Sequence, residues 1–451
     1  MSTSLAAVLA REAVLSPAQD AGDTAVVQAV MDNLWLVIAG CLVFLMQAGF
    51  AFVEAGLTRA KNLANIMAKN LADMAVGVTM FFIVGWTIAY GAGGNDWIGG
   101  FGDLFFAESS DPAVLFDISG GLSPATNFFF QVVFAATAVT IASGAMAERT
   151  KFTTYLIFAA VMTAVIYPVV VHWTWGGGLI AGISIGDAVY SDFAGSTIVH
   201  LTGAIAALVG AAMIGPRLGR YGPNGEPRAI PGHNIGYAVI GVFILWFGWF
   251  GFNAGSELAA DHLLSFLAMN TLLAAAAGVV GATLVIWRKT GVADVAMAGN
   301  GALAGLVSIT APVGAVEPWA ALVIGFVGGL IVVYSVLFLD RVEIDDPVGA
   351  VSVHGTCGIW GTLSIGLFAT YDDAFLGRPD AGLFYGGGLD QLLMQLVMVL
   401  IVIAWVGAAC VVLFSVLKAT LGLRVDEEEE VMGLDVAEHG SAGYGLESVA
   451  G

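Results

Sequence analysis

Long apolar runs separated by short polar segments dominate this chain. Most runs reach about 20 residues, the length of helix that spans a hydrocarbon core roughly 30 Å thick. They predict helices over residues 31–57, 63–91, 126–147, 152–174, 195–214, 233–255, 260–287, 293–311, 318–338, 347–369 and 390–420. We therefore expect an all-α integral membrane protein with eleven transmembrane helices.

Composition supports a place in the lipid bilayer and excludes several functions. Charged residues make up 11% of the chain, against roughly 25% in soluble domains. The net charge of −20 excludes a nucleic-acid binder, and a lysine-poor, acidic surface suggests a source that lives in high salt. Cys41, Cys357 and Cys410 each lie in an apolar run and are expected to be core residues, with no metal site.

Basic residues predict the orientation. If the connection holding Arg59 and Lys61 is inside, alternation of the helices places every basic residue inside except Arg11 and Arg378. This arrangement predicts an extracytoplasmic segment over 1–30, a membrane domain over 31–420 and a cytoplasmic tail over 421–451. Residues 1–29 lack a basic stretch, so a signal peptide is only weakly supported.

Two segments of the chain repeat the same motif. Asp192, Gly195, Val199, His200 and Thr202 match Asp346, Gly349, Val353, His354 and Thr356 at identical offsets. The two copies begin the fifth and the tenth predicted helix, an odd number of helices apart, so they enter the membrane from opposite faces. We expect an inverted five-plus-five repeat, with halves over 31–214 and 233–369 and an eleventh helix over 390–420.

The repeat places one histidine in the middle of the membrane from each half. Each lies eight residues after its aspartate, about 12 Å along a helix, so His200 and His354 are expected to meet near mid-bilayer. Such a pair can pass a proton or hold a small polar solute. A hydrogen-bonded pair with no transport role stays open as an alternative. His172, His233, His262 and His439 are expected at the interfaces.

Aromatic and small residues gather near the predicted outer face. Phe134, Trp175, Phe252 and Ser256 lie at helix ends there; they are either ordinary belt anchors or a site for a small cation. Cation–π attraction supplies about 0.5–2 kcal/mol, whereas a bare ion entering low dielectric costs on the order of 20 kcal/mol. A cation that sheds its proton escapes this cost. Ammonium can do so; sodium and potassium cannot.

Several segments resemble the Amt/Rh ammonium transporter family, Amt branch, over nearly the whole chain. The most specific runs from Asp192-Phe-Ala-Gly-Ser through Gly203-Ala204 to Gly215-Pro-Arg217. Further matches are Phe130–Ala135, Trp175–Gly178, Gly248–Ser256 and Val353–Gly355. The resemblance implies a transporter that recruits ammonium outside, removes its proton and conducts ammonia, with the proton handled separately.

The resemblance also implies the roles of individual residues. The implied recruitment site is Phe134, Trp175 and Ser256; the stacked gate is Phe134 and Phe252; the pore histidines are His200 and His354; and Asp192 supports the site by capping its helix. Glu54 has no implied role in conduction, and we expect it to pair with Arg59 or Lys61.

Further expectations concern assembly, regulation and location. The resemblance implies a homotrimer in the cell membrane, without a cofactor, that also accepts methylammonium. The tail element Gly433-Leu-Asp435 is expected to pack beneath the bundle and to couple to a PII-type regulator. An ammonium sensor that signals through this tail is the alternative function. An enzyme is not expected, because no HExxH, nucleophile–base pair or phosphate loop is found.

Overall fold

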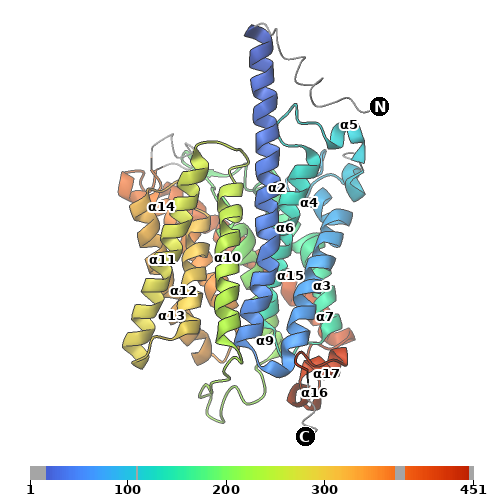
Figure 1. The fold of residues 1–451 in the computed structure, drawn as a ribbon, viewed down its shortest axis with the longest axis vertical. Helices are drawn as coiled ribbons and strands as arrows, with labels where there is room; N and C mark the ends of the chain where they lie inside the picture. Colours follow the sequence, from blue (N-terminus) through green and yellow to red (C-terminus); the bar gives the residue numbers. More distant parts are fainter. Residues whose placement is uncertain (1–16, 108–109, 371–380, 446–451) are drawn as a thin grey trace.

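A bundle of long helices forms the protein (Figure 1). The computed structural model describes residues 17–107, 110–370 and 381–445, so Arg11 and Arg378 lie outside the described residues. The elements in chain order are α2 (Pro17–Leu57), η1 (Ala60–Asn62), α3 (Leu63–Met80), η2 (Phe81–Gly85), α4 (Trp86–Tyr90), η3 (Phe101–Phe106), α5 (Pro112–Leu115), α6 (Pro124–Ala145), α7 (Phe152–Val161), η5 (Met162–Ile166), α8 (Tyr167–Trp173), β1 (Ser184–Ile185), β2 (Ala188–Val189), η6 (Ser196–Leu201), α9 (Thr202–Ile214), α10 (Ile235–Gly255), α11 (Leu263–Thr290), α12 (Val295–Thr310), α13 (Pro318–Arg341), η7 (Val351–Thr356), α14 (Cys357–Phe368), η9 (Leu383–Tyr385), α15 (Asp390–Thr420), α16 (Glu427–Met432) and α17 (Leu434–His439).

The helices match the predicted runs closely. Among the described residues, ten helices are long and apolar enough to cross a membrane. The remaining predicted helix, over 293–311, corresponds to α12, which is apolar but shorter than the others. An all-helical membrane fold is therefore confirmed.

The first helix is longer than predicted. It begins at Pro17 rather than near residue 31, and its start extends beyond the rest of the bundle (Figure 1). Polar residues such as Asp20, Asp23 and Asp32 interrupt the apolar pattern there, which is why a search for apolar runs misses this part. The end of the bundle on this side is called the N-terminal face below.

The opposite end, the C-terminal face, carries α16 and α17 (Figure 1). The backbone N–H of Asn65 donates to Asp435 Oδ1 at 2.9 Å, and the N–H of Leu434 donates to Asn62 Oδ1 at 2.9 Å. Lys61 Nζ donates to the carbonyl of Glu430 at 2.6 Å. The tail thus packs against the start of α3, as the resemblance implies.

Glycine lets helices of the second half approach closely. At Gly305 of α12, an added Cβ would collide with the carbonyl oxygen of Ala274 on α11, and at Gly325 of α13 with the same oxygen. Small residues at such crossings are the usual way helices pack in lipid, where the hydrophobic effect does not drive them together.

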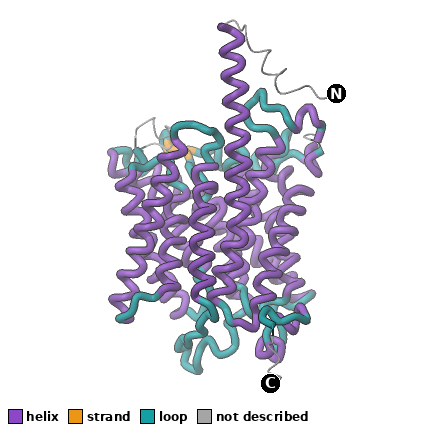
Figure 2. The backbone as a smooth tube through the Cα atoms, in the orientation of Figure 1, coloured by secondary structure: helices purple, strands orange, loops and turns teal. Residues whose placement is uncertain are grey.

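Within the part of the chain that the structure describes, four helices contain a π-helical turn: η2, η5, η6 and η7. The last two begin α9 and α14 and hold the repeated motif, which the sequence predicted as plain helix. The short β1–β2 hairpin lies at the N-terminal face, before η6 (Figure 2). π-helical turns are rare and are often found at functional sites.

Two predictions about individual side chains are wrong. Cys357 and Cys410 are buried, but Cys41 on α2 is exposed on the isolated chain because it points away from the bundle. His172 is buried rather than interfacial: its Nδ1 lies 3.0 Å from the carbonyl oxygen of Ala89, and its Nε2 lies 2.8 Å from that of Asn95.

Candidate functional site

The two repeated histidines meet inside the bundle. His200 on η6 and His354 on η7 are both buried, and their Nδ1 atoms lie 3.2 Å apart. The centres of their rings are 5.2 Å apart, with 25° between the planes. One Nδ1 must therefore carry a proton and donate it to the other. His200 Nε2 is buried with no hydrogen-bond partner among the described residues.

Aromatic rings surround His200. Phe252 stacks on it with centroids 5.2 Å apart, and Trp249 with centroids 5.0 Å apart. Both rings come from α10 and are fully buried. Trp249 is held in place because its indole N–H donates to Thr310 Oγ1 at 2.9 Å. On the other side, the ring of Phe50 from α2 lies 5.9 Å from His354.

A stacked pair of phenyl rings separates the histidines from the N-terminal face. Phe134 on α6 stacks on Phe252 with centroids 4.2 Å apart and 29° between the planes. Both side chains are almost completely buried. The stacked pair therefore lies between His200 and the cavity on the N-terminal side.

Beyond this pair, a cavity of about 360 Å³ opens toward the N-terminal face. Its lining is mainly aromatic and neutral: Tyr90, Asn127, Phe130, Gln131, Phe134, Trp175, Phe193, Ser256 and Leu258. The ring of Trp175 lies edge-on to Phe134, with centroids 6.3 Å apart. A cation here meets π faces and polar oxygens, and no carboxylate is among the lining residues.

Asp192 organises the start of η6. Its two carboxylate oxygens accept hydrogen bonds from four backbone N–H groups, those of Gly195, Ser196, Thr197 and Ile198, at 2.7–3.1 Å. Gly195 has φ +115°, a conformation that favours glycine. The carbonyl of Asp192 also accepts from the indole N–H of Trp175 at 3.0 Å, so this residue joins the helix that holds His200 to the cavity at the N-terminal face.

Asp346 caps the start of η7 in the same way. It accepts from the backbone N–H groups of Gly349, Ala350 and Val351 at 2.8–3.1 Å, and Gly349 has φ +79°. The recurring local geometry supports the predicted repeat. It also explains why Asp and Gly recur at the same offset from each histidine.

On the C-terminal side, the path continues through a small cavity and a larger pocket. His354, Glu54 and Phe50 line the small cavity, whose volume of about 20 Å³ holds roughly one water molecule. Asn300 and Val348 line both this cavity and a pocket of about 320 Å³ at the C-terminal face. A continuous series of contacts thus connects the two faces.

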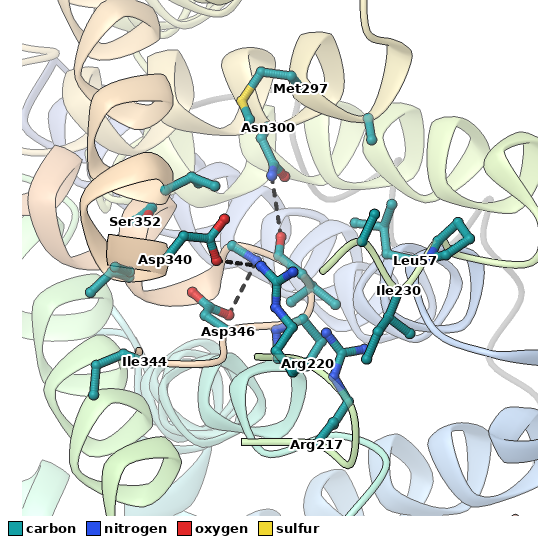
Figure 3. Close-up of a pocket in the computed structure, with 18 of the residues that line it drawn as sticks. Leu57, Arg217, Arg220, Ile230, Met297, Asn300, Asp340, Ile344, Asp346 and Ser352 are labelled. Carbon is teal, nitrogen blue, oxygen red and sulfur yellow. Dashed lines mark hydrogen bonds and ion pairs between the residues drawn. The ribbon is translucent and has the colours of Figure 1, made fainter. Parts of the chain in front are cut away.

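Charged and polar groups line this last pocket. Figure 3 shows Arg220 and Asp340 in a direct ion pair, and the side chain of Asn300 directed toward a backbone carbonyl of the lining. Asn300 donates to the carbonyl of Val348 at 3.2 Å. This pocket could not be predicted from the sequence, because its lining comes mainly from α12, α13 and two connections far apart in the chain.

Arg217 is the centre of an ion-pair network beside the pocket. It contacts Glu148 at 2.6 Å and Asp345 at 2.9 Å. Burial by itself would raise the pKa of Glu148, but the guanidinium groups of Arg217 and Arg59 outweigh it and hold the pKa at about 2. Burial likewise opposes ionisation of Asp345, and its contacts with Arg217 and Arg149 lower its pKa to about 2.

The sequence analysis predicted that Glu54 pairs with Arg59 or Lys61, and this prediction is wrong. Arg59 lies past the end of α2 and reaches Glu148 at 3.0 Å, whereas Glu54 is buried inside α2 and accepts from Ser143 Oγ at 2.8 Å. Trp249, Phe50 and Glu54 are the site residues that sequence reasoning missed. An aromatic or acid within an apolar run does not reveal which way it points.

Comparisons with known proteins agree with this arrangement. The model of the Ammonium Transporter Family matches residues 34–444. The chain is 47% identical to the ammonium transporter Amt2 of Archaeoglobus fulgidus, over 92% of this chain and 88% of the relative. It is 41% identical to Amt1 of Haloferax mediterranei, over 94% of this chain and 81% of the relative.

Solved structures give the same result. A sensor Amt protein is similar with a TM-score of 0.84 and 36% identity, over 92% of this chain and 99% of that chain. Mep2 of Candida albicans is similar with a TM-score of 0.79 and 28% identity, over 88% and 87%. The chain therefore belongs to the ammonium transporter family.

Proposed function

We propose that this transporter recruits ammonium in the outer cavity, removes its proton and conducts ammonia past the histidine pair. The observation that carries the proposal is the order of contacts along the path. An aromatic cavity leads to the stacked pair Phe134–Phe252, which stacks on His200, which bonds to His354.

Desolvation decides which species passes. The interior near the histidines is lined by Phe252, Trp249 and Phe50. These side chains have no oxygen atoms that could replace the hydration shell of a cation. A bare ion there costs on the order of 20 kcal/mol, and each aromatic face returns about 0.5–2 kcal/mol. Neutral ammonia avoids this cost and can hydrogen-bond to the free His200 Nε2.

The histidine pair also offers a route for the proton. Since one Nδ1 donates to the other, one ring has a bare Nε2 and the other an N–H at Nε2. A proton that binds the bare Nε2 can move across the Nδ1–Nδ1 bond, and a different proton then leaves from the second ring. The pair can thus hold the neutral solute and transfer the proton separately.

We further propose the arrangement of the protein in the cell. Eleven helices cross the cell membrane as an inverted repeat, with the N-terminus outside and the C-terminal face in the cytoplasm, where Arg59, Lys61, Arg217 and Arg220 lie. The resemblance supports a homotrimer and a PII-type regulator at the tail.

A sensor is the second candidate function. It is supported by the similarity to the solved sensor Amt protein and by the close contact of the tail with α3. In a sensor, ammonium binding in the outer cavity would change this contact without substantial flux.

Uptake of labelled methylammonium into liposomes tests the proposal. Vesicles with the wild-type protein are expected to take it up faster than protein-free vesicles. His200→Ala and His354→Ala are each expected to lower or alter selective flux, because the surviving ring loses its partner. Wild-type vesicles no faster than empty ones would exclude transport. Unchanged flux and selectivity in both variants would reduce the pair to a structural contact.

A further inference from the structure

A second cluster of charged groups lies in the bundle beside the histidine path, and of its members only Glu54 borders that path, at the small cavity. Glu54 on α2 and Lys69 and Asp73 on α3 are all almost completely buried. Ionisable side chains at such depth are rare and usually functional.

Polar neighbours hold the cluster together. Glu54 Oε2 accepts from Ser143 Oγ at 2.8 Å, and Lys69 Nζ donates to the carbonyl of Ser143 at 3.1 Å. The Lys69 ammonium also lies over the ring of Tyr155, 5.2 Å from its centre. The hydroxyl of Tyr155 in turn donates to Asp73 Oδ2 at 2.6 Å.

The charges in this cluster do not balance. Two carboxylates face one ammonium, so one negative charge remains if all three groups are ionised. The arginines of the nearby network are already paired with other acids: Arg59 with Glu148, Arg217 with Glu148 and Asp345, and Arg220 with Asp340. One bound proton would make the buried cluster neutral.

Two acceptor atoms are free to bind that proton. Glu54 Oε1 and Asp73 Oδ1 are buried and have no hydrogen-bond partner among the described residues. The amide of Asn70 is close to Glu54 but donates to the carbonyl of Ile66. Only Glu54 lines the small cavity that His354 also lines, and this cavity has room for roughly one water molecule.

We propose that Glu54, supported by Lys69 and Asp73, is a proton-binding site that receives the proton from the histidine pair on the C-terminal side. The proton leaves His354 through the water in the shared cavity and binds a carboxylate oxygen of Glu54. It then passes to water in the pocket at the C-terminal face, and the carboxylate is restored. This inference rests on the proposed function, since it requires a proton released from ammonium.

Glu54→Gln is the decisive variant. It keeps the shape and the acceptor for Ser143, removes the proton-binding oxygen, and leaves Lys69 and Asp73 as a balanced pair. The charge moved per methylammonium taken up, measured by solid-supported membrane recording with parallel uptake of label, is expected to fall roughly tenfold or more. Uptake itself should persist, because the neutral path is intact. The apparent melting temperature should be equal to or above that of the wild type.

Two results would overturn the site: an unchanged ratio of charge to uptake in Glu54→Gln, and wild-type uptake without any charge movement. If the unchanged ratio comes with a drop in melting temperature, Glu54 is a structural partner of Lys69. If Glu54→Gln does not fold, Glu54→Asp carries the test: its shorter side chain should lower the ratio, and an unchanged ratio overturns the proposal.

The exposed Glu428→Gln is the control for loss of one acid and should keep the wild-type ratio. Failure of the proposed function gives a different result, because wild-type vesicles would then show no uptake at all.

Discussion

His200 Nε2, Glu54 Oε1 and Asp73 Oδ1 are buried polar atoms without hydrogen-bond partners among the described residues. Each such atom costs roughly 1–3 kcal/mol, and a protein selected for stability alone would satisfy or remove them. All three lie along or beside the path between the two faces. Their cost is understandable if a passing solute or proton supplies the missing bond.

The hydrogen bonds of Asp192 predict that its replacement lowers both the stability of the protein and its apparent affinity for methylammonium. Asp192→Asn replaces a carboxylate that accepts four N–H groups by an amide whose NH₂ faces donors, so it should destabilise the protein by about 1–3 kcal/mol. Because the carbonyl of this residue holds Trp175, the methylammonium concentration for half-maximal uptake should also rise.

Asp346→Asn is the matched control for Asp192→Asn. It removes the equivalent cap before η7 and should lower the melting temperature similarly, without raising the half-maximal concentration. If both variants raise that concentration equally, Asp192 has no special connection to the outer cavity.

Some of the site could be predicted from these residues and some could not. The repeated Asp, Gly and His revealed the pair and its caps, because identical offsets from a helix start place side chains at equivalent depths. The place of Glu54 could not be predicted. Its direction depends on how α2 rotates against α3 and α6, and spacing from Arg59 along the chain says nothing about that rotation.

At the scale of the secondary-structure element, the length of the apolar runs predicted nearly every long helix, because a helix that crosses a bilayer needs a minimum number of apolar residues. The π-helical turns escaped prediction, since one extra residue in a turn barely changes an apolar run. Both histidines lie on such turns. The early start of α2 also escaped, because the polar residues in its first turns interrupt the apolar run.

Close helix contact predicts a strong effect at one glycine. Gly305→Ala would bring a methyl group against the backbone of Ala274, which cannot move aside, and should destabilise the bundle by about 1–3 kcal/mol. In Gly407→Ala on α15, the nearest atom to the new methyl group is the Ile205 Cγ2, at 3.8 Å. This control should be neutral or slightly stabilising. Melting temperatures in detergent compare the two; equal values would mean that α11 and α12 can separate at little cost.

At the scale of the whole molecule, the C-terminal face joins the two proposed halves and the tail. Arg217, between the halves, binds Glu148 from the first half and Asp345 from the second. Glu430 of α16 accepts from the N–H of Leu218 at 2.7 Å and pairs with Arg424 at 2.6 Å. A displacement of the tail would therefore act directly on the connection whose Arg217 and Arg220 line the pocket at the C-terminal face.

This network should make stability depend on pH in acid. The pKa of Glu148 is lowered from 4.5 to about 2 in the folded protein. Its stabilising effect is thus fully present above about pH 4.5 and is lost as the pH falls toward 2, by linkage on the order of 3 kcal/mol. Glu148→Gln should therefore melt well below the wild type at pH 7, and the difference should shrink steadily between pH 4.5 and 3, because a protonated glutamic acid resembles glutamine. The exposed Glu428→Gln should match the wild type at every pH. If the difference in melting temperature between Glu148→Gln and the wild type stays constant down to pH 3, the ionisation of Glu148 does not stabilise the junction between the proposed halves.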